Sequence, residues 1–107
     1  MPLVKIFALR GVKPLPVASL QASLCNVWGT KPNTTKLMVS LVDEWTSSGG
    51  EDVFVDVRAK KTPDRTRDAV MAKMQEVQVV FKDHGYKANV RLETYEADSY
   101  FHLLPSQ

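Results

Sequence analysis

The sequence predicts an α+β fold, in which a four-stranded mixed sheet carries two helices on one face. Three observations lead to this prediction: four segments have the composition or alternation of strands, two have helical spacing of apolar residues, and the order strand–helix–strand occurs twice. The two units span about 2–45 and 52–96. Right-handed crossovers place both helices on the same face. We expect one domain over 1–107, with a loop at 46–51 and a C-terminal tail at 97–107.

The first unit begins with a strand over residues 3–9, LVKIFAL, which ends before Arg10 and Gly11. Pro16 is placed to start a helix in its first turn, and Gly29 ends that helix. Its apolar residues recur at helical spacing: Val17, Leu20, Leu24, Val27 and Trp28. Residues 36–45 form the next strand. Val39 and Leu41 lie on one of its faces, and Met38, Ser40 and Val42 lie on the other.

The second unit repeats this order after the loop. Residues 52–60 alternate, with Val53, Val55, Val57 and Ala59 on one face and Asp56, Arg58 and Lys60 on the other. Thr62 is the expected helix cap, with Pro63 at the first helical position. The buried stripe of this helix is Val70, Met74, Val77 and Phe81, and His84-Gly85 closes it. Residues 88–96 alternate again, with Arg91, Glu93 and Tyr95 on one face.

Composition excludes several classes of protein. The formal charge of the 107 residues is only +2, from 14 basic and 12 acidic residues, so nothing predicts nucleic acid as a partner. No apolar run is long enough to cross a membrane, and no signal peptide is visible. The single cysteine and the absence of a ligand cluster predict neither a metal site nor a cofactor. We expect a cytoplasmic protein, with unconventional secretion left open.

The sheet face opposite the helices has a mixed character. It carries Asp56, Arg58 and Lys60 beside apolar residues such as Met38 and Val42. This face is too apolar to be fully hydrated and too charged to form a closed core. We therefore expect a partner subunit or a ligand to cover it.

Pro2 directly precedes the first strand, although proline contributes no N–H to a sheet. It is tolerated there simply as the first residue of a strand. Removal of Met1 would also make it a secondary amine on a rigid ring. An α-amino group has a pKa of about 7.7–8.0, and burial or nearby positive charge lowers that pKa. Such a nitrogen is suited to act as a base near neutral pH.

Pro2, the duplicated β-α-β order and the turn Gly29-Thr30-Lys31-Pro32 together resemble the tautomerase superfamily. The subgroup that looks most similar is that of macrophage migration inhibitory factor, whose members carry a Gly-Lys-Pro turn after the first helix. The resemblance covers nearly the whole chain. It implies a homotrimer with sites at the subunit interfaces and a proline that acts as the catalytic base. It also implies that Lys31 binds the carboxylate of a small carbonyl substrate.

The chain departs from that subgroup on the last strand. A rough alignment places Arg91 and Glu93 where the factor-like members usually carry tyrosine and asparagine. Arg91 would join Pro2 and Lys31 in a cationic set that stabilises an enolate, and Lys60 and Arg10 are further cations. In other branches of the superfamily, arginines and an acid activate water for dehalogenation, hydration or decarboxylation. Glu93 or Asp98 would supply that acid here.

These residues predict a tautomerase that moves a proton between carbon and oxygen in small carbonyl or 2-oxo acids. The same residues also fit purely structural roles. Arg91 and Glu93 fit an ion pair at the protein surface, and Lys31 fits a solvated turn. The chain also fits a non-catalytic trimer that binds another protein. The element order matches an RNA-recognition fold as well, but the strands lack its aromatic pattern.

Overall fold

The computed structural model describes residues 3–11, 14–30, 36–46, 49–103 and 105. The first unit contains β1 (Leu3–Leu9), α1 (Val17–Trp28) and β2 (Lys36–Val42), and the second contains β3 (Val53–Lys60), α2 (Arg67–Asp83) and β4 (Ala88–Tyr95). A short 3-10 turn, Ala97–Ser99, begins the tail. The predicted order of elements is confirmed.

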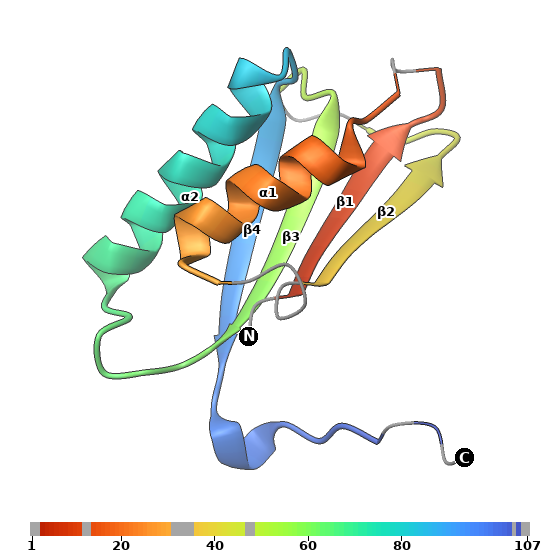
Figure 1. The fold of residues 1–107 in the computed structure, drawn as a ribbon. Helices are drawn as coiled ribbons and strands as arrows, with labels where there is room; N and C mark the ends of the chain where they lie inside the picture. Colours follow the sequence, from red (N-terminus) through yellow and green to blue (C-terminus); the bar gives the residue numbers. More distant parts are fainter. Residues whose placement is uncertain (1–2, 12–13, 31–35, 47–48, 104, 106–107) are drawn as a thin grey trace.

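The four strands form one mixed sheet in the order β2-β1-β3-β4. The strands of each unit are parallel, β1 with β2 and β3 with β4, whereas β1 and β3 meet in antiparallel fashion at the centre. Both helices lie on one face of the sheet, where α1 crosses in front of the central strands and α2 lies beside β4 (Figure 1). The predicted fold class is therefore confirmed.

The core lies between the two helices and the sheet. Alternate residues of the central strands are fully buried there, and Leu20, Leu24, Val77 and Phe81 of the helices pack against them. The buried strand residues are Val4, Ile6 and Ala8 of β1 and Val53, Val55, Val57 and Ala59 of β3. The same alternation directs the remaining residues of these strands to the opposite face, which we call the open face.

The start of α2 differs from the sequence prediction. Thr62 and Pro63 do not open the helix, because Thr62 to Arg65 form a turn in which the Arg65 N–H donates to the Thr62 carbonyl at 3.0 Å. Proline suits the second position of such a turn as well as the first position of a helix. The cap is Thr66, whose hydroxyl accepts from the Ala69 N–H at 3.3 Å.

Two further details of the first unit differ from the simplest interpretation of the sequence. The second strand ends at Val42 and not at residue 45. Val17 belongs to the apolar residues that recur at helical spacing, yet it is exposed at the first turn of α1 and lies outside the core. Gly29 ends α1 as predicted, with a φ of 63° that suits glycine.

Candidate functional site

The register of the sheet brings polar residues of the open face together at the start of β1. Leu3 lies opposite Lys36 of β2 on one side and Arg58 of β3 on the other. Arg58 in turn lies opposite Glu93 of β4. Adjacent strands are about 4.8 Å apart, so two cations and one acid flank the first residue of β1 across the sheet.

A cavity of about 210 Å³ lies at this end of the sheet. It is lined by Leu3, Lys36, Met38, Arg58, Tyr95, Tyr100 and His102. The tail leaves β4 and runs beneath the ends of the other strands (Figure 1). The tail thus supplies part of the wall, and we call this cavity the β1 pocket.

Aromatic contacts hold the tail at the β1 pocket. The rings of Tyr95 and Tyr100 stack with their centroids 4.6 Å apart and an interplanar angle of 25°. His102 meets Tyr100 edge to face at 6.2 Å. Because stacked aromatic pairs add stability beyond their buried area, these contacts fix the direction of the chain after β4.

The lining of the β1 pocket suits an anion with a planar body. Lys36 and Arg58 are the charged residues among those that line it, and both are positive. Arginine binds carboxylates through a planar fork of N–H donors, and lysine adds a point charge. The tyrosine rings and Leu3 provide apolar surface beside these cations. Cations beside apolar and aromatic surface can together bind a small carboxylate.

Arg91, a predicted site residue, has a partner within the chain. Its Nε and Nη2 donate to the two carboxylate oxygens of Asp56 at 3.2 and 3.0 Å, and its guanidinium lies 5.4 Å from the centroid of the Phe54 ring. These bonds and the charge of Asp56 raise the pKa of Arg91. Arg91 and Asp56 face each other two residues further along the sheet than Arg58 and Glu93. Within one chain, Arg91 thus serves Asp56 and not the β1 pocket.

The other candidate residues that the structure describes are not among the residues that line the β1 pocket. Glu93 is exposed on β4, beside Arg58. Lys60 is exposed at the end of β3, opposite Tyr95, and its carbonyl accepts a hydrogen bond from Arg65. Asp98 lies in the exposed 3-10 turn of the tail. Arg10 is bound to Asp43 at 2.7 Å, at the far end of β1 from Leu3.

Pro2 and Lys31 lie outside the described residues. Leu3, which lines the β1 pocket, is the residue that follows Pro2 in the sequence. In the described part of the chain, no three side chains of His, Cys, Asp or Glu are grouped to hold a metal ion. No described helix is long and apolar enough to cross a membrane.

Sequence reasoning did not select Lys36, Arg58, Tyr100 or His102 as site residues. Arg58 was visible as a charged residue of the open face, but only the antiparallel register of β1 and β3 places it beside Leu3. Lys36 depends on the parallel register of β2 in the same way. Tyr100 and His102 follow the last strand, where no periodic pattern indicates the course of the tail.

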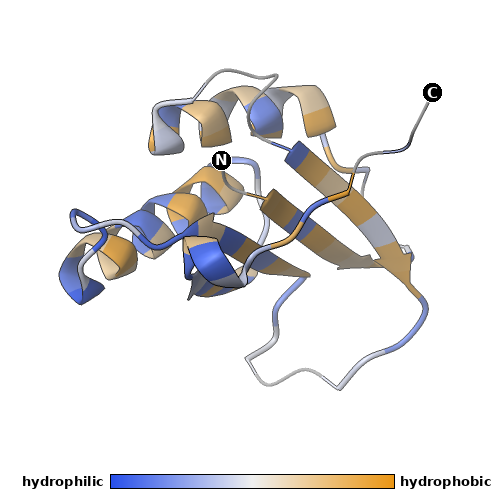
Figure 2. Cartoon of the chain, turned by 90° about the horizontal axis from the view of Figure 1, so that it is seen from below, coloured by the Kyte–Doolittle hydropathy of each residue, from blue (hydrophilic) through white to orange (hydrophobic). Residues whose placement is uncertain are grey.

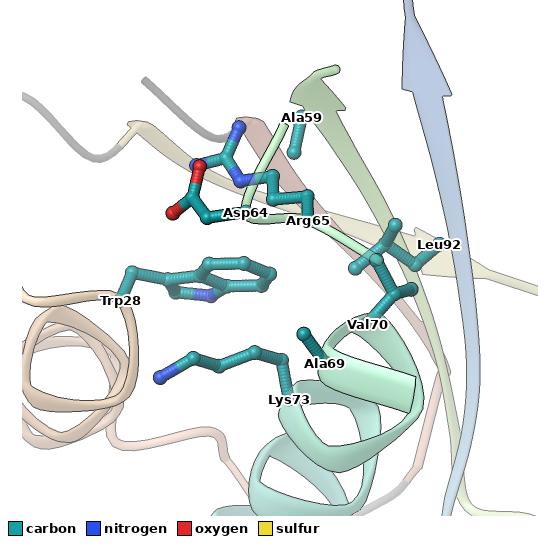
Figure 3. A pocket seen from close by; sticks show the side chains of 8 residues that line it. All are labelled: Trp28, Ala59, Asp64, Arg65, Ala69, Val70, Lys73 and Leu92. Atoms are coloured by element: carbon teal, nitrogen blue, oxygen red, sulfur yellow. The ribbon is translucent and has the colours of Figure 1, made fainter. Parts of the chain in front are cut away.

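A second cavity, of about 280 Å³, lies on the helical side of the sheet, between the end of α1 and the start of α2. It is lined by Trp28, Ala59, Asp64, Arg65, Ala69, Val70, Lys73 and Leu92 (Figure 3). Arg58 and Ala59 are neighbours in β3 with side chains on opposite faces, so the sheet separates this cavity from the β1 pocket. We call it the helix cavity.

No protein-family model matches the chain, and no curated protein matches its sequence. Solved structures do match. A member of the cis-3-chloroacrylic acid dehalogenase family superposes with a TM-score of 0.70 at 12% identity, over 96% of this chain and 83% of that one. Malonate semialdehyde decarboxylase matches with a TM-score of 0.67 at 15% identity, over 97% and 92% of the two chains.

The macrophage migration inhibitory factor of Toxoplasma gondii matches with a TM-score of 0.61 at 11% identity, over 94% of this chain and 95% of that one. The chain has the fold of the tautomerase superfamily. The fold that the resemblance implied is thereby confirmed. Because the matches come from several branches, the tautomerase fold does not single out the factor-like subgroup.

Proposed function

We propose that this chain is an enzyme of the tautomerase type that uses Pro2, freed by removal of Met1, as a general base. Its substrate is a small carbonyl compound or 2-oxo acid with a carboxylate. The observation that carries the proposal is the β1 pocket, in which Leu3, the residue after Pro2, lies between Lys36 and Arg58. The tautomerase fold supports it, since the matched proteins include enzymes.

The cations have two roles in this reaction. Removal of a proton beside a carbonyl develops negative charge on the oxygen, and fixed positive groups stabilise that charge. The same groups disfavour protonation of a nearby amine and lower its pKa from about 7.7–8.0. Lys36 and Arg58 would therefore bind the substrate and keep Pro2 neutral. Lys31, Arg91, Glu93 and Lys60 remain proposed contacts to substrate, contributed by the same or a neighbouring subunit.

We further propose a homotrimer whose neighbouring subunits complete the site. Phe101 and Leu103 of the tail are 87% and 96% exposed, and Met38 beside the β1 pocket is 47% exposed. Hydrophobic residues occur both on the strands and along the tail (Figure 2). Exposed apolar side chains of this number on a small chain favour burial by another copy. A similar structure, a fused 4-OT protein, is described as a symmetric trimer (TM-score 0.63, 13% identity, over 88% and 85% of the chains).

The test compares the parent chain with Pro2→Ala. Mass spectrometry of the intact chain first establishes that Met1 is removed, because a retained methionine turns the proline nitrogen into an amide. The parent is expected to ketonise the enols of phenylpyruvate or hydroxyphenylpyruvate, and the variant to lose most of this activity. Labelling of the free amine as a function of pH measures the pKa of Pro2. No turnover by the parent of these enols, of halo-acids or of oxo-acids would end the enzyme proposal.

A second candidate is a hydratase or decarboxylase of the same fold. The observation that favours it is Glu93, which lies opposite Arg58 and provides an acid next to a cation. An acid in that position can activate water. Turnover of malonate semialdehyde or a 3-haloacrylate, with none of the enols, would select this reaction. The chain would instead be a non-catalytic ligand of another protein if such a partner binds it and Pro2→Ala leaves that binding unchanged.

A further inference from the structure

The tail presents alternate residues to the β1 pocket. The backbone at Tyr100 is extended, with a φ of −109° and a ψ of 126°. Successive side chains of an extended chain point to opposite sides. In agreement with this, Tyr100 and His102 line the pocket, whereas Phe101 and Leu103 are largely exposed. The tail therefore brings an imidazole to the cavity that Leu3 of β1 also lines.

Two ring contacts connect this imidazole to the sheet. His102 meets the Tyr100 ring edge to face, at an interplanar angle of 65°. Tyr100 in turn stacks on Tyr95, the last residue of β4. Because β4 belongs to the same sheet as β1 and β3, these contacts hold the imidazole relative to the strands that form the rest of the pocket.

The titratable side chains around His102 come from β2, β3, β4 and the tail itself. Those that line the pocket with it are Lys36, Arg58, Tyr95 and Tyr100. Glu93 lies across the ladder from Arg58. Guanidinium, ammonium and phenol groups ordinarily keep their protons at neutral pH, whereas histidine gains and loses one there. Among the described residues that line the pocket, His102 is therefore the one best suited to exchange a proton with a bound molecule.

We infer that His102 is a second catalytic residue, which acts as the acid opposite the base Pro2; this inference rests on the proposed function. In enolisation the Pro2 nitrogen takes the proton from the carbon beside the carbonyl, and the C–H electron pair forms the C=C bond. The π pair of the carbonyl moves to the oxygen, which takes a proton from the His102 imidazolium and leaves a neutral imidazole. In ketonisation both protons return. Lys36 and Arg58 hold the carboxylate throughout.

The first test is His102→Gln, because glutamine retains a hydrogen-bond donor but cannot transfer a proton. A positioned acid or base contributes typically 10²- to 10⁴-fold, so kcat for the phenylpyruvate enol is expected to fall by about 10²-fold with little change in KM. The profile of kcat/KM against pH should also lose one of its two limbs, which a merely structural role would not cause.

His84→Gln is the matched control, since His84 is the other histidine of the chain. It lies at the end of α2, with its Nδ1 at 2.8 Å from the Val80 carbonyl, and it does not line the β1 pocket. This variant is expected to keep the activity of the parent and both limbs of the profile.

A second pair of variants tests whether Tyr100 positions His102. Tyr100→Phe retains the ring and both ring contacts, so it is expected to keep kcat close to that of the parent. Tyr100→Leu removes the ring and is expected to lower kcat by up to about tenfold. Equal rates for Tyr100→Phe and Tyr100→Leu would contradict the positioning role.

A spectroscopic measurement tests the contact without turnover. The probe is phenyllactate, in which a hydroxyl replaces the carbonyl, so that it cannot enolise. In a ¹H–¹³C spectrum it is expected to shift the imidazole resonances of His102 and leave those of His84 in place, with the two glutamine variants supplying the assignment. Unmoved His102 resonances at saturating phenyllactate would overturn the inference.

The kinetic outcomes separate this inference from the proposed function. If Pro2→Ala is inactive while His102→Gln is as active as His84→Gln, the inference is overturned and the proposed function stands. A parent without any turnover ends the proposed function, and the catalytic role of His102 ends with it.

Discussion

At the scale of single residues, the sequence suggested Pro2 as a base, but it did not indicate which charged residues lie beside the start of β1. Arg91 was predicted to join the cationic set, yet the structure binds it to Asp56 through two hydrogen bonds. Alternation along a strand says which face a residue occupies, but it does not say which residue lies across the ladder. The pairing of Leu3 with Arg58 depends on register, which is set by packing between strands.

Arg58→Gln tests this reassignment in the proposed enzyme. Loss of a charged donor to the developing oxyanion is expected to lower kcat/KM by about 10²- to 10³-fold. Steady-state kinetics on the enol substrate measure the change. Arg67→Gln, at an exposed position on α2, is expected to retain full activity. Full activity of Arg58→Gln together with inactivity of Arg91→Gln would restore the original assignment.

Tyr86 ties the end of α2 to the loop before α1. Its hydroxyl donates to the Pro14 carbonyl at 2.9 Å, and its side chain is buried. Tyr86→Phe is expected to lower the free energy of unfolding by about 1 kcal/mol at neutral pH. Urea denaturation measures the difference. An equal stability of the two chains at neutral pH would contradict this role.

The same residue predicts a dependence on pH. Burial, and to a smaller extent the charge of Asp52, raises the pKa of Tyr86 above its ordinary value of 10.0. The folded chain therefore favours the neutral phenol. Its stabilising contribution is complete below about pH 10, and it is lost as the pH rises through the folded pKa. The gap in stability between the parent and Tyr86→Phe should shrink as the pH rises above about 10, whereas a constant gap would contradict the shift.

At the scale of elements, strands and helices followed from periodicity, and their ends did not. Val53 to Lys60 alternate without interruption, so the faces of β3 were correctly predicted. The sequence predicted Thr62 as the cap of α2, but the cap is Thr66, four residues later. The local signal was misleading because Thr62-Pro63-Asp64 also satisfies a β-turn.

Thr66→Ala tests which threonine caps α2. It is expected to cost about 1 kcal/mol of folding free energy, because the Ala69 N–H loses its side-chain acceptor. Thr66→Ser retains the hydroxyl and should stay within a few tenths of a kcal/mol of the parent. Thermal or urea unfolding followed by circular dichroism measures both. A Thr66→Ala chain as stable as Thr66→Ser would show that the cap contributes little.

At the scale of the whole molecule, the open face connects the fold to the proposed function. The sequence predicted that this face needs a cover, since apolar Met38 and Val42 share it with charged residues. The structure adds that the tail carries exposed Phe101 and Leu103. Neither a single chain nor its sequence specifies how copies would meet, because that geometry depends on surfaces contributed by two chains at once.

Two methionines with nearly the same exposed fraction allow a test of which face copies of the chain use to associate. Met38 on the open face is 47% exposed, and Met71 on α2 is 46% exposed. If copies associate through the open face, Met38→Arg places a charge in the buried interface and is expected to yield monomers. Met71→Arg should leave the trimer intact, because it changes the outer helical face. Light scattering coupled to size-exclusion chromatography gives both masses directly. A trimer that survives Met38→Arg and dissociates with Met71→Arg would move the interface to the helices and remove neighbouring subunits from the β1 pocket.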